Sequence, residues 1–559
     1  MPHQAALRAT TRGALSGVRH PTLGAATAVA TDVQAAIVAA LEGPAAYPHA
    51  APDVTHVQTH ISHVFLVGPH AYKMKKAVVF PFLDFGTRAA REHFCREEVR
   101  LNRRLASGIY LDVLPVVRAQ GSFVVGGVGE PIDWLVHMVR LPAERSLVSL
   151  VRARAVSVAT LETLAARLAR FHAEAPVVEG GTPEVLIQIW NDNLDGVRPF
   201  VGRHLAEEDF EVLADFGATF VTRHDAVLRA RPQLGHVREG HGDLRADHVY
   251  VLDEAIGVPG LAPVPPGIHV VDCIEFSATF RAIDVAADVS FLAMELEQLD
   301  RKDLADAFVR AYAEAASDQL VPALVPYYAC HRATVRGKVE ALACEERELG
   351  DAARAAAAER ARDAFVVAGR FAWRSGDPVV IACAGLSGTG KSTVAAALGA
   401  ATGFEVVSSD VLRKCAPASA AQPLYAVAAR RATYARVRRE VERLLAAGKS
   451  VIVDATLTSR AERDRLARSA RGYGRRWLFV QTTADEAVIR RRLDARDHRS
   501  VSDARWDVYL RQRDEHDGFV EGEPVLTIDT TAGLASARAR LVRSLWAWRQ
   551  NRPISLATT

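Results

Sequence analysis

The 559-residue sequence has few cysteines, little net charge and no long apolar run. Its six cysteines include no C-x-x-C pair, which excludes a disulfide-rich secreted scaffold and the commonest zinc and redox motifs. No apolar run is long enough to span a bilayer, and a net charge of +3 creates no field that would draw the chain to nucleic acid or to an anionic membrane. We therefore expect a reduced, cytoplasmic protein with no membrane partner.

The length is too great for one hydrophobic core, so two to four domains are expected. With 49% hydrophobic and 24% charged residues, the composition is that of a globular protein. We expect residues 1–44 to form a largely disordered extension, although residues 32–41 have the pattern of a short amphipathic helix.

One stretch carries a complete phosphate-binding signature. Residues 385–392, GLSGTGKS, match G-x-x-x-x-G-K-[ST] between an apolar run that predicts a buried strand (379–384) and a helix-forming segment (393–399). The glycines let several N–H groups point at one anion, and the helix N-terminus adds its positive end. Lys391 is predicted to contact the β- and γ-phosphates of ATP, and Ser392 to bind Mg²⁺. The predicted nucleotide-binding residues here are Gly385, Ser387, Gly388, Thr389, Gly390, Lys391, Ser392 and Thr393.

Strand and helix patterns alternate after this loop, which predicts a parallel sheet covered by helices on both faces. Asp410 follows the second strand, where it is suited to accept a proton from an acceptor hydroxyl. Asp454 ends the next strand and is predicted to support Mg²⁺. Ala455 follows it in place of the glutamate with which hydrolytic ATPases activate water, so the pattern favours transfer to a hydroxyl over hydrolysis.

Two basic segments follow the sheet pattern. Arg492 and Arg496 lie four apart on a predicted helix and so on one face, as in a lid whose arginines stabilise charge during transfer; the alternative is a solvated basic helix. The other segment, residues 430–443, holds six arginines with Tyr434 among them and Tyr425 shortly before. It is either a solvated face or a site for an anionic acceptor, including a nucleic-acid end.

The N-terminal part begins with a β-rich block. Residues 63–68 and 71–76 predict a hairpin that turns at Gly68-Pro69, residues 88–105 predict a helix, and three more strands follow by residue 140. From residue 157 the pattern is helical, apart from an island with two β-like runs at 240–276. This order predicts a small β lobe and a helical lobe, as in a two-lobed kinase.

Four residues occur in the order that a kinase-like site requires. Lys73 lies in a predicted strand and would contact the α- and β-phosphates, and Glu98 on the next helix would hold it in an ion pair, with Glu97 as the alternative. Asp243, in H-G-D-L, would accept the proton of the acceptor hydroxyl. Asp272, at the end of V-V-D, would hold Mg²⁺ between the phosphates.

The motifs HGDLR (241–245), VDCIEF (271–276) and IDVAAD (283–288) resemble those of the aminoglycoside phosphotransferase/choline kinase family. From about residue 45 the chain resembles a bacterial subgroup in which this domain is fused to a P-loop domain of the AAA-family ATPase type. The resemblance implies that Asp288 buttresses the catalytic loop. It also implies a second Mg²⁺ ligand at His248, where the family has asparagine; the hard cation prefers oxygen, and Asp247 is the alternative ligand.

The C-terminal part resembles small P-loop kinases of the gluconate kinase, zeta-toxin and polynucleotide kinase type. The expected domains are a kinase-like domain (45–345), a helical linker (346–376), a P-loop domain (377–549) and a tail (550–559). We expect an ATP- and Mg²⁺-dependent phosphotransferase that acts on small hydroxylated molecules. The alternatives are a regulatory or stress protein whose kinase-like domain only senses a ligand, and a polynucleotide or nucleotide kinase in the C-terminal half.

Overall fold

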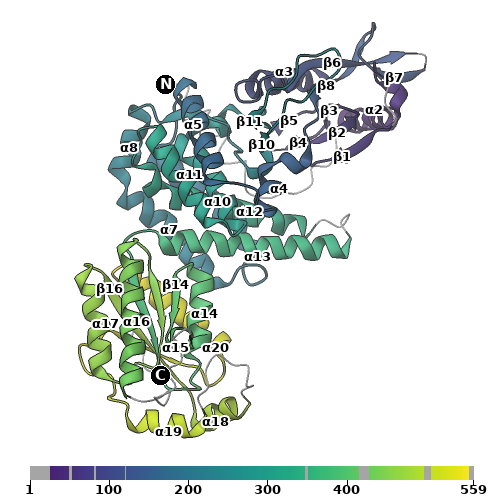
Figure 1. The fold of residues 1–559 in the computed structure, drawn as a ribbon. Coiled ribbons are helices and arrows are strands. Elements are labelled where there is room, and N and C mark those ends of the chain that lie inside the picture. Colours follow the sequence, from purple (N-terminus) through teal and green to yellow (C-terminus); the bar gives the residue numbers. More distant parts are fainter. Residues whose placement is uncertain are drawn as a thin grey trace. The chain divides into compact units, whose positions relative to one another are not determined.

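The computed structural model describes residues 25–49, 53–80, 83–119, 121–345, 350–414, 427–495 and 505–552. The chain forms two compact units (Figure 1). Unit 1 comprises Met1–Pro199 and Gly217–Lys338, and unit 2 comprises Phe200–Phe216 and Val339–Thr559. Sequence reasoning did not anticipate that residues 200–216 belong to the second unit. Among the described residues, no helix is long and apolar enough to cross a bilayer.

The first part of unit 1 is a six-stranded antiparallel sheet with the order β1-β2-β3-β8-β6-β7. The predicted hairpin is confirmed: β2 and β3 pair antiparallel, and Gly68 in the turn between them adopts φ 54°, a conformation that glycine tolerates. The strands are β1 (Thr55–Gln58), β2 (Ser62–Val67), β3 (His70–Lys75), β6 (Tyr110–Ala119), β7 (Ser122–Val125) and β8 (Pro131–Val139), with a separate small pair β4 (Val79–Phe80) and β5 (Leu83–Asp84).

Helices α2 (Ala25–Leu41) and α3 (Arg88–Asn102) cover opposite faces of this sheet (Figure 1). Because α2 is a helix, the prediction that residues 1–44 are largely disordered was wrong for residues 25–41. Ile37 and Leu41 are fully buried against the sheet, and the Gln34 side chain donates to the Lys75 carbonyl oxygen at 2.9 Å and to Asp133 Oδ2 at 2.8 Å. Burial of this apolar face, about 25 cal/mol per Å², explains why the segment is ordered. Residues 1–24 lie outside the described residues.

The second part of unit 1 is helical, with two small strand pairs beside the helices. The pair formed by Val249–Leu252 and Gly267–Val270 confirms the two β-like runs predicted at 240–276, whereas the other pair lies outside that island. The pairs are β9 (Val237–Glu239) with β12 (Ala282–Asp284), and β10 (Val249–Leu252) with β11 (Gly267–Val270). The helices are η2 (Ala143–Arg145), α4 (Leu147–Arg152), α5 (Val158–Glu174), α6 (Pro183–Val197), α8 (Asp225–Gln233), η4 (Ala246–His248), α9 (Ala278–Arg281), α10 (Val285–Gln298) and α11 (Lys302–Ala315). The helices η3 (Arg198–Phe200), α7 (Glu207–Arg223) and α12 (Val321–Ala343) cross the boundary between the units in the sequence.

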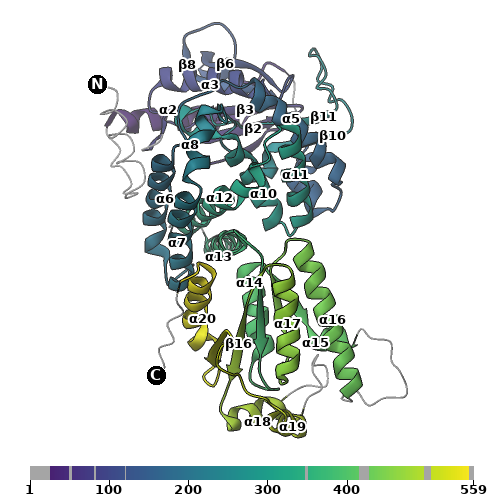
Figure 2. The same ribbon diagram turned by 90° about the vertical axis from the view of Figure 1, so that its left-hand side faces the viewer.

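Unit 2 contains a five-stranded sheet in which every strand is parallel, with the order β14-β15-β13-β16-β17. Helices cover both of its faces, which confirms the predicted fold class (Figure 2). The strands are β13 (Val379–Ala384), β14 (Glu405–Ser408), β15 (Val451–Asp454), β16 (Arg476–Thr483) and β17 (Val525–Asp529). The helices are α13 (Asp351–Arg374), α14 (Lys391–Thr402), α15 (Ser409–Lys414), α16 (Val427–Ala446), α17 (Arg460–Gly472), α18 (Glu486–Asp494), α19 (Trp506–Asp514) and α20 (Leu534–Arg549).

Residues 200–216 join unit 2 because acidic side chains of α7 meet basic side chains of α20. Arg538 Nη2 donates to Asp209 Oδ2 at 2.5 Å, and Arg543 Nε donates to Glu211 Oε2 at 2.6 Å. The buried Trp546 donates its indole N–H to Asp215 Oδ2 at 2.8 Å. These partners are more than 300 residues apart in the sequence, so no local pattern predicts their pairing.

Candidate active sites

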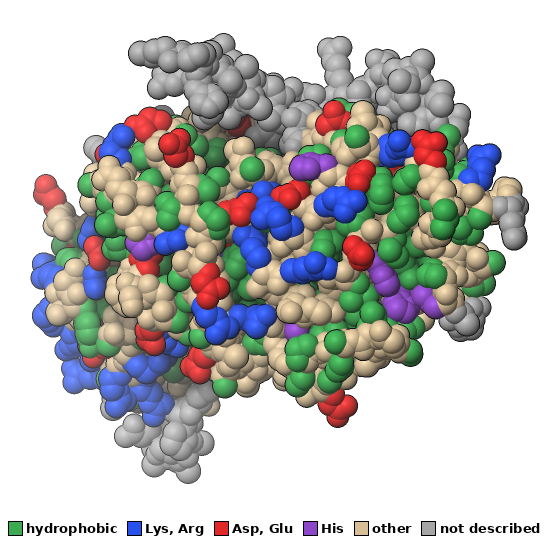
Figure 3. Space-filling view, turned by 90° about the horizontal axis from the view of Figure 1, so that it is seen from above, with side chains coloured by type: hydrophobic (Ala, Val, Ile, Leu, Met, Phe, Trp, Pro, Cys, Tyr) green, Lys and Arg blue, Asp and Glu red, His purple; other side chains and the backbone are tan. Residues whose placement is uncertain are grey.

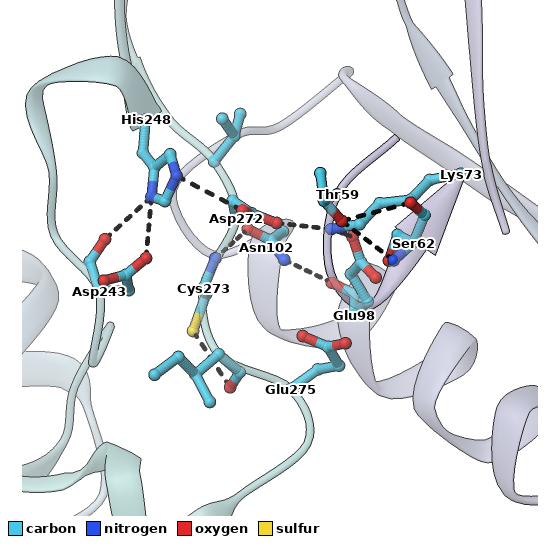
Figure 4. A network of polar contacts seen from close by, with 12 residues as sticks. Thr59, Ser62, Lys73, Glu98, Asn102, Asp243, His248, Asp272, Cys273 and Glu275 are labelled. Atoms are coloured by element: carbon cyan, nitrogen blue, oxygen red, sulfur yellow. Dashed lines mark hydrogen bonds and ion pairs between the residues drawn. The ribbon is translucent and has the colours of Figure 1, made fainter. Parts of the chain in front are cut away.

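In unit 1, one lysine contacts two carboxylates from distant parts of the chain. Lys73 Nζ on β3 donates to Glu98 Oε1 on α3 at 2.9 Å and to Asp272 Oδ1, just after β11, at 2.6 Å (Figure 4). Glu97 pairs instead with Arg100, so the structure places Glu98 and not its neighbour beside the lysine. Three of the predicted site residues are therefore within one group of contacts.

The charges in this group stabilise one another. Burial lowers the pKa of Lys73, but Asp272 and Glu98 outweigh that effect and hold the pKa well above its ordinary value. Burial raises the pKa of Glu98, but Lys73 and Lys75 outweigh it, so the pKa is lowered. Partial burial likewise raises the pKa of Asp272, whereas Lys73 and His248 lower it, with a net shift well below its usual range. All three groups are charged at neutral pH.

A second lysine and a third carboxylate complete the group, and sequence reasoning missed both. Lys75 Nζ donates to Glu98 Oε2 at 2.7 Å and also to Glu275. The Lys75 side chain is fully buried, and Glu275 is nearly so. Because side chains alternate along a strand, Lys73 and Lys75 share a face. That spacing was the available signal for the second lysine.

The backbone at Asp272 is held in an unusual conformation. Asp272 has φ 63°, in the left-handed region, which aspartate and asparagine enter more readily than most residues. Its N–H donates to Tyr110 Oη at 3.1 Å, and the next N–H, of Cys273, donates to Asn102 Oδ1 at 2.9 Å. Asn102 in turn donates to the Glu98 carbonyl oxygen at 2.9 Å. These contacts aim the Asp272 carboxylate at Lys73.

The catalytic loop predicted around Asp243 is fastened to Asp288. The fully buried Asp288 carboxylate accepts the N–H groups of His241 at 2.6 Å and Gly242 at 2.9 Å. Burial raises the pKa of Asp288, but contacts with His172 and with His241 outweigh it and lower the pKa. This geometry supports the buttressing role that the family resemblance implies. Asp243 follows the fastened backbone with its side chain 30% exposed, within reach of an acceptor.

His248 lies between Asp243 and Asp272 (Figure 4). Its Nδ1 is 2.9 Å from the Asp243 carbonyl oxygen, and its Nε2 is 3.4 Å from Asp272 Oδ2. The Asp272 carboxylate, which is 42% exposed, is a suitable ligand for Mg²⁺. The imidazole nitrogen of His248 is not, because Mg²⁺ prefers oxygen ligands. The donor set of unit 1 thus fits one Mg²⁺ position and fits a second one poorly.

In unit 2, the predicted strand, loop and helix are present as β13, residues 385–390 and α14. Gly385, Gly388 and Gly390 have φ values of 150°, 87° and 89°, which L-residues rarely adopt. A Cβ at Gly385 would lie 2.4 Å from Thr482 Oγ1, so close packing also requires glycine there. Ser387, Thr389 and Lys391 are buried. Ser392 and Thr393, at the start of α14, are exposed to a ligand at the helix N-terminus.

The side chains expected to bind Mg²⁺ in unit 2 contact one another. Ser392 Oγ donates to Asp454 Oδ1 at 3.1 Å, and Ser408 Oγ donates to Asp454 Oδ2 at 3.3 Å. Parallel pairing puts Ser408 and Asp454 in register at the carboxyl edge of the sheet. Hydroxyl and carboxylate oxygens are the ligands that Mg²⁺ takes, so this donor set fits the ion.

Asp410 lies on α15, two residues after the end of β14. Its Oδ1 is 3.1 Å from Nη2 of Arg413, one helical turn on, and its side chain is 21% exposed. The strand end thus places a carboxylate with a cationic neighbour at the same edge of the sheet as Asp454.

The helix predicted to form a lid, α18, contacts the phosphate-binding loop, and so does α19. Arg492 donates to the Gly388 carbonyl oxygen at 3.3 Å and to the Thr530 carbonyl oxygen at 2.6 Å, so its guanidinium ties the loop to the segment after β17. On α19, Gln512 Oε1 accepts the Ser387 N–H at 2.9 Å, a contact that sequence reasoning missed. Arg496 lies outside the described residues.

Much of the basic helix α16 is engaged within unit 2. Arg438 pairs with Glu462 at 2.8 Å and Arg443 with Glu440 at 2.6 Å. Tyr434 is buried, and its Oη accepts the Leu457 N–H at 3.0 Å. This tyrosine therefore serves the core and is not a surface for stacking bases. Tyr425 lies outside the described residues.

Comparison with known proteins finds similarities over different parts of the chain. Residues 380–516 match the family described as "AAA domain". A gluconokinase from Sinorhizobium meliloti 1021 is 21% identical and covers 31% of this chain and 97% of its own, with a TM-score of 0.23. A choline/ethanolamine kinase family protein from Mesorhizobium loti is 13% identical and covers 60% of this chain and 98% of its own, with a TM-score of 0.34.

Two curated relatives match across both units. "Uncharacterized protein Rv2004c" of Mycobacterium tuberculosis (strain ATCC 25618 / H37Rv) is 33% identical over 417 residues, which are 71% of this chain and 77% of the relative. "Uncharacterized protein Mb2027c" of Mycobacterium bovis has the same identity and coverage. At this identity and coverage, the chain belongs to the family of these mycobacterial proteins.

Proposed function

We propose that this protein is an ATP-dependent phosphotransferase with a nucleotide site in each unit, acting on hydroxyl groups of small molecules. The observation that carries the proposal is the contact of Lys73 with both Glu98 and Asp272. A lysine held by a helix glutamate beside a metal-binding aspartate is the arrangement with which kinases bind and orient the phosphates of ATP.

In unit 1, Lys73 would bind the α- and β-phosphate oxygens, and Asp272 would hold Mg²⁺. The ion, when bound, neutralises the charge that develops on the phosphates. Asp243 would orient the acceptor hydroxyl. As the acceptor oxygen bonds to the γ-phosphorus, the bond from that phosphorus to the β,γ-bridging oxygen breaks, and the hydroxyl proton passes to the Asp243 carboxylate. ADP is the leaving group.

Unit 2 supports the same chemistry with different residues. Lys391 and the N–H groups of residues 385–392 would bind the phosphates, and Ser392 with Asp454 would hold Mg²⁺. Asp410 would accept the proton of the acceptor hydroxyl. No carboxylate follows Asp454, because Ala455 occupies that place, and this supports transfer to a hydroxyl over hydrolysis.

The partners of the charged side chains on α16 favour a small-molecule acceptor over a nucleic-acid end. In Figure 3, acidic and basic side chains are mixed near the centre of the face, whereas Lys and Arg side chains gather at its lower left edge. On α16, Arg438 and Arg443 have acidic partners and Tyr434 is buried. A nucleic-acid site needs cations that are available to phosphates.

A screen of metabolite fractions for phosphate transfer from radiolabelled ATP tests the proposal. The full chain is compared with Asp243→Asn, which silences unit 1, with Lys391→Met, which silences unit 2, and with the double variant. We expect acceptor-dependent transfer that one single variant abolishes for a given acceptor and the other leaves intact. Transfer that survives in the double variant, or none from any fraction despite bound ATP, would contradict the proposal; the latter result would favour ligand sensing.

A further inference from the structure

The position of His248 raises the question of which cation the unit 1 site accepts. His248 Nδ1 lies 2.9 Å from the Asp243 carbonyl oxygen, which is able only to accept a hydrogen bond. Nδ1 therefore carries the hydrogen in the neutral ring. The lone pair of the neutral ring is then on Nε2.

Two carboxylate oxygens face that nitrogen. His248 Nε2 is 3.4 Å from Asp272 Oδ2 and 3.9 Å from Asp247 Oδ1. Asp247 Oδ1 is buried and has no hydrogen-bond partner among the described residues, whereas the other oxygen of this carboxylate pairs with Arg245. In the neutral ring, the lone pair of His248 Nε2 and the Asp272 oxygen thus face each other with no hydrogen between them. A cation bound by His248 Nε2 and Asp272 Oδ2 would satisfy both of these electron-pair donors.

The separations suit a first-row divalent ion. Ligand atoms bound at about 2.1 Å lie roughly 3.0 Å apart in an octahedral arrangement and roughly 3.4 Å apart in a tetrahedral one. The distance between His248 Nε2 and Asp272 Oδ2 falls at the upper end of that range. An imidazole nitrogen is a good ligand for transition-metal ions and a poor one for Mg²⁺.

We propose that the position between His248 and Asp272 binds a divalent transition-metal ion in preference to Mg²⁺. The inference rests on the proposed function, because triphosphate oxygens of ATP complete the coordination. Among the described residues, no group of three or more His, Cys, Asp or Glu has the geometry of a metal site. The ion is accordingly held by two protein ligands and arrives with the nucleotide. The Asp247 carboxylate, 3.9 Å from His248 Nε2, adds negative charge beside it without binding it directly.

Pulsed electron paramagnetic resonance of Mn²⁺ tests this inference, because the unpaired electrons of the ion couple to a directly bound nitrogen. The full chain carries Lys391→Met and Ser392→Ala, which remove the metal position of unit 2, and is loaded with Mn²⁺ and a non-hydrolysable ATP analogue. The variants are His248→Ala and His248→Asn. The matched control is His236→Asn, since His236 also lies beside a carboxylate, that of Asp318 at 3.4 Å, away from the nucleotide site.

We expect nitrogen coupling of the size given by bound imidazole in the parent and in His236→Asn, and its loss in His248→Ala. In a competition titration, His248→Asn should lower the preference for Mn²⁺ over Mg²⁺ by about tenfold or more, since an amide oxygen replaces the nitrogen. A nucleotide-bound Mn²⁺ without nitrogen coupling, or coupling that persists in His248→Ala, would overturn this inference and leave the proposed function standing. Absence of nucleotide binding to unit 1 in calorimetry would overturn the proposed function with it.

Discussion

Lys73 and Asp272 are 199 residues apart in the sequence, and the lysine Nζ lies 2.6 Å from the aspartate Oδ1. In the kinase arrangement the lysine contacts phosphates and the aspartate contacts Mg²⁺. Without nucleotide, the charges of Lys73 and Asp272 neutralise each other. Binding of Mg-ATP replaces their contact with one between Lys73 and phosphate and another between Asp272 and Mg²⁺. The pair thus keeps the site charge-balanced in both states.

Asp243 and Asp272 have different roles, so substituting them should impair different steps: transfer in one case and Mg-ATP binding in the other. Asp272→Asn keeps a side chain that tolerates the left-handed backbone and removes the charge; it should weaken Mg-ATP binding to unit 1 by about tenfold to a hundredfold. Asp243→Asn should leave binding nearly unchanged and abolish transfer from unit 1. Calorimetry of the full chain in a Lys391→Met background measures both. Equal losses of affinity in the two variants would refute the division of roles.

Lys391 supplies the cation of the phosphate-binding loop in unit 2. Lys391→Met should weaken ATP binding there by about tenfold to a hundredfold, the range expected for a lost charge-assisted contact. Lys449→Met is the matched control, because this exposed lysine pairs with Glu405 at 2.8 Å on the surface. Nucleotide titration in an Asp272→Asn background isolates the site. The prediction is wrong if the two variants bind ATP alike.

Asp410 is assigned the proton transfer in unit 2. Asp410→Asn should retain ATP binding and slow transfer by roughly a hundredfold, the usual effect of losing a general base. Single-turnover kinetics with labelled ATP separate the two steps. A loss of affinity without a change in the transfer rate would instead make Asp410 part of the metal or phosphate site.

Glu98 holds two buried ammonium groups, and its loss should destabilise unit 1. Glu98→Gln leaves Lys73 paired with Asp272 and Lys75 paired with Glu275, so each ammonium group loses one carboxylate and keeps another. The cost should be about 1.5–3 kcal/mol in the free energy of unfolding, the range for lost hydrogen bonds to charged groups. Glu97→Gln is the control one residue away; its partner Arg100 is half exposed, so the cost should stay under about 1 kcal/mol. Chemical unfolding followed by a signal from unit 1 compares them. Equal costs would show that the buried network adds no stability.

Acid should destabilise unit 1 through buried histidines. His137 stacks on Tyr72 at 4.7 Å, and burial, with His70 beside it, lowers the pKa of His137 to about 4. In the unfolded chain its pKa is about 6.5, so the unfolded state binds the proton first as pH falls. The stability of unit 1 should therefore fall between about pH 6.5 and 4. His137→Phe keeps the stacking and should flatten this slope in thermal unfolding; an unchanged slope would exclude His137 as a contributor.

Much of the fold and part of each site follow from local patterns. The phosphate loop, the hairpin that carries Lys73 and the parallel strands depend on residues that are neighbours in the sequence, so spacing alone predicts them. The sequence does not show which face of α3 packs on the sheet, and this orientation decides that Glu98, and not Glu97, contacts Lys73. Glu275 and Gln512 are positioned by contacts across 200 and 125 residues, which no local pattern contains. The amphipathic pattern at residues 32–41 predicted part of α2, but its order was missed because the sheet that covers its apolar face is not evident from the local pattern.

The pairing of residues 200–216 with α20 means that the two halves of this chain are not separable by one cut. A fragment that starts at residue 339 or 377 would keep Arg538, Arg543 and Trp546 and lose their acidic partners. In the gene, the codons for residues 200–216, which belong to unit 2, lie between the two coding segments of unit 1. Recombination that exchanges the C-terminal half alone would separate residues 200–216 from α20, so the two units are expected to be inherited together.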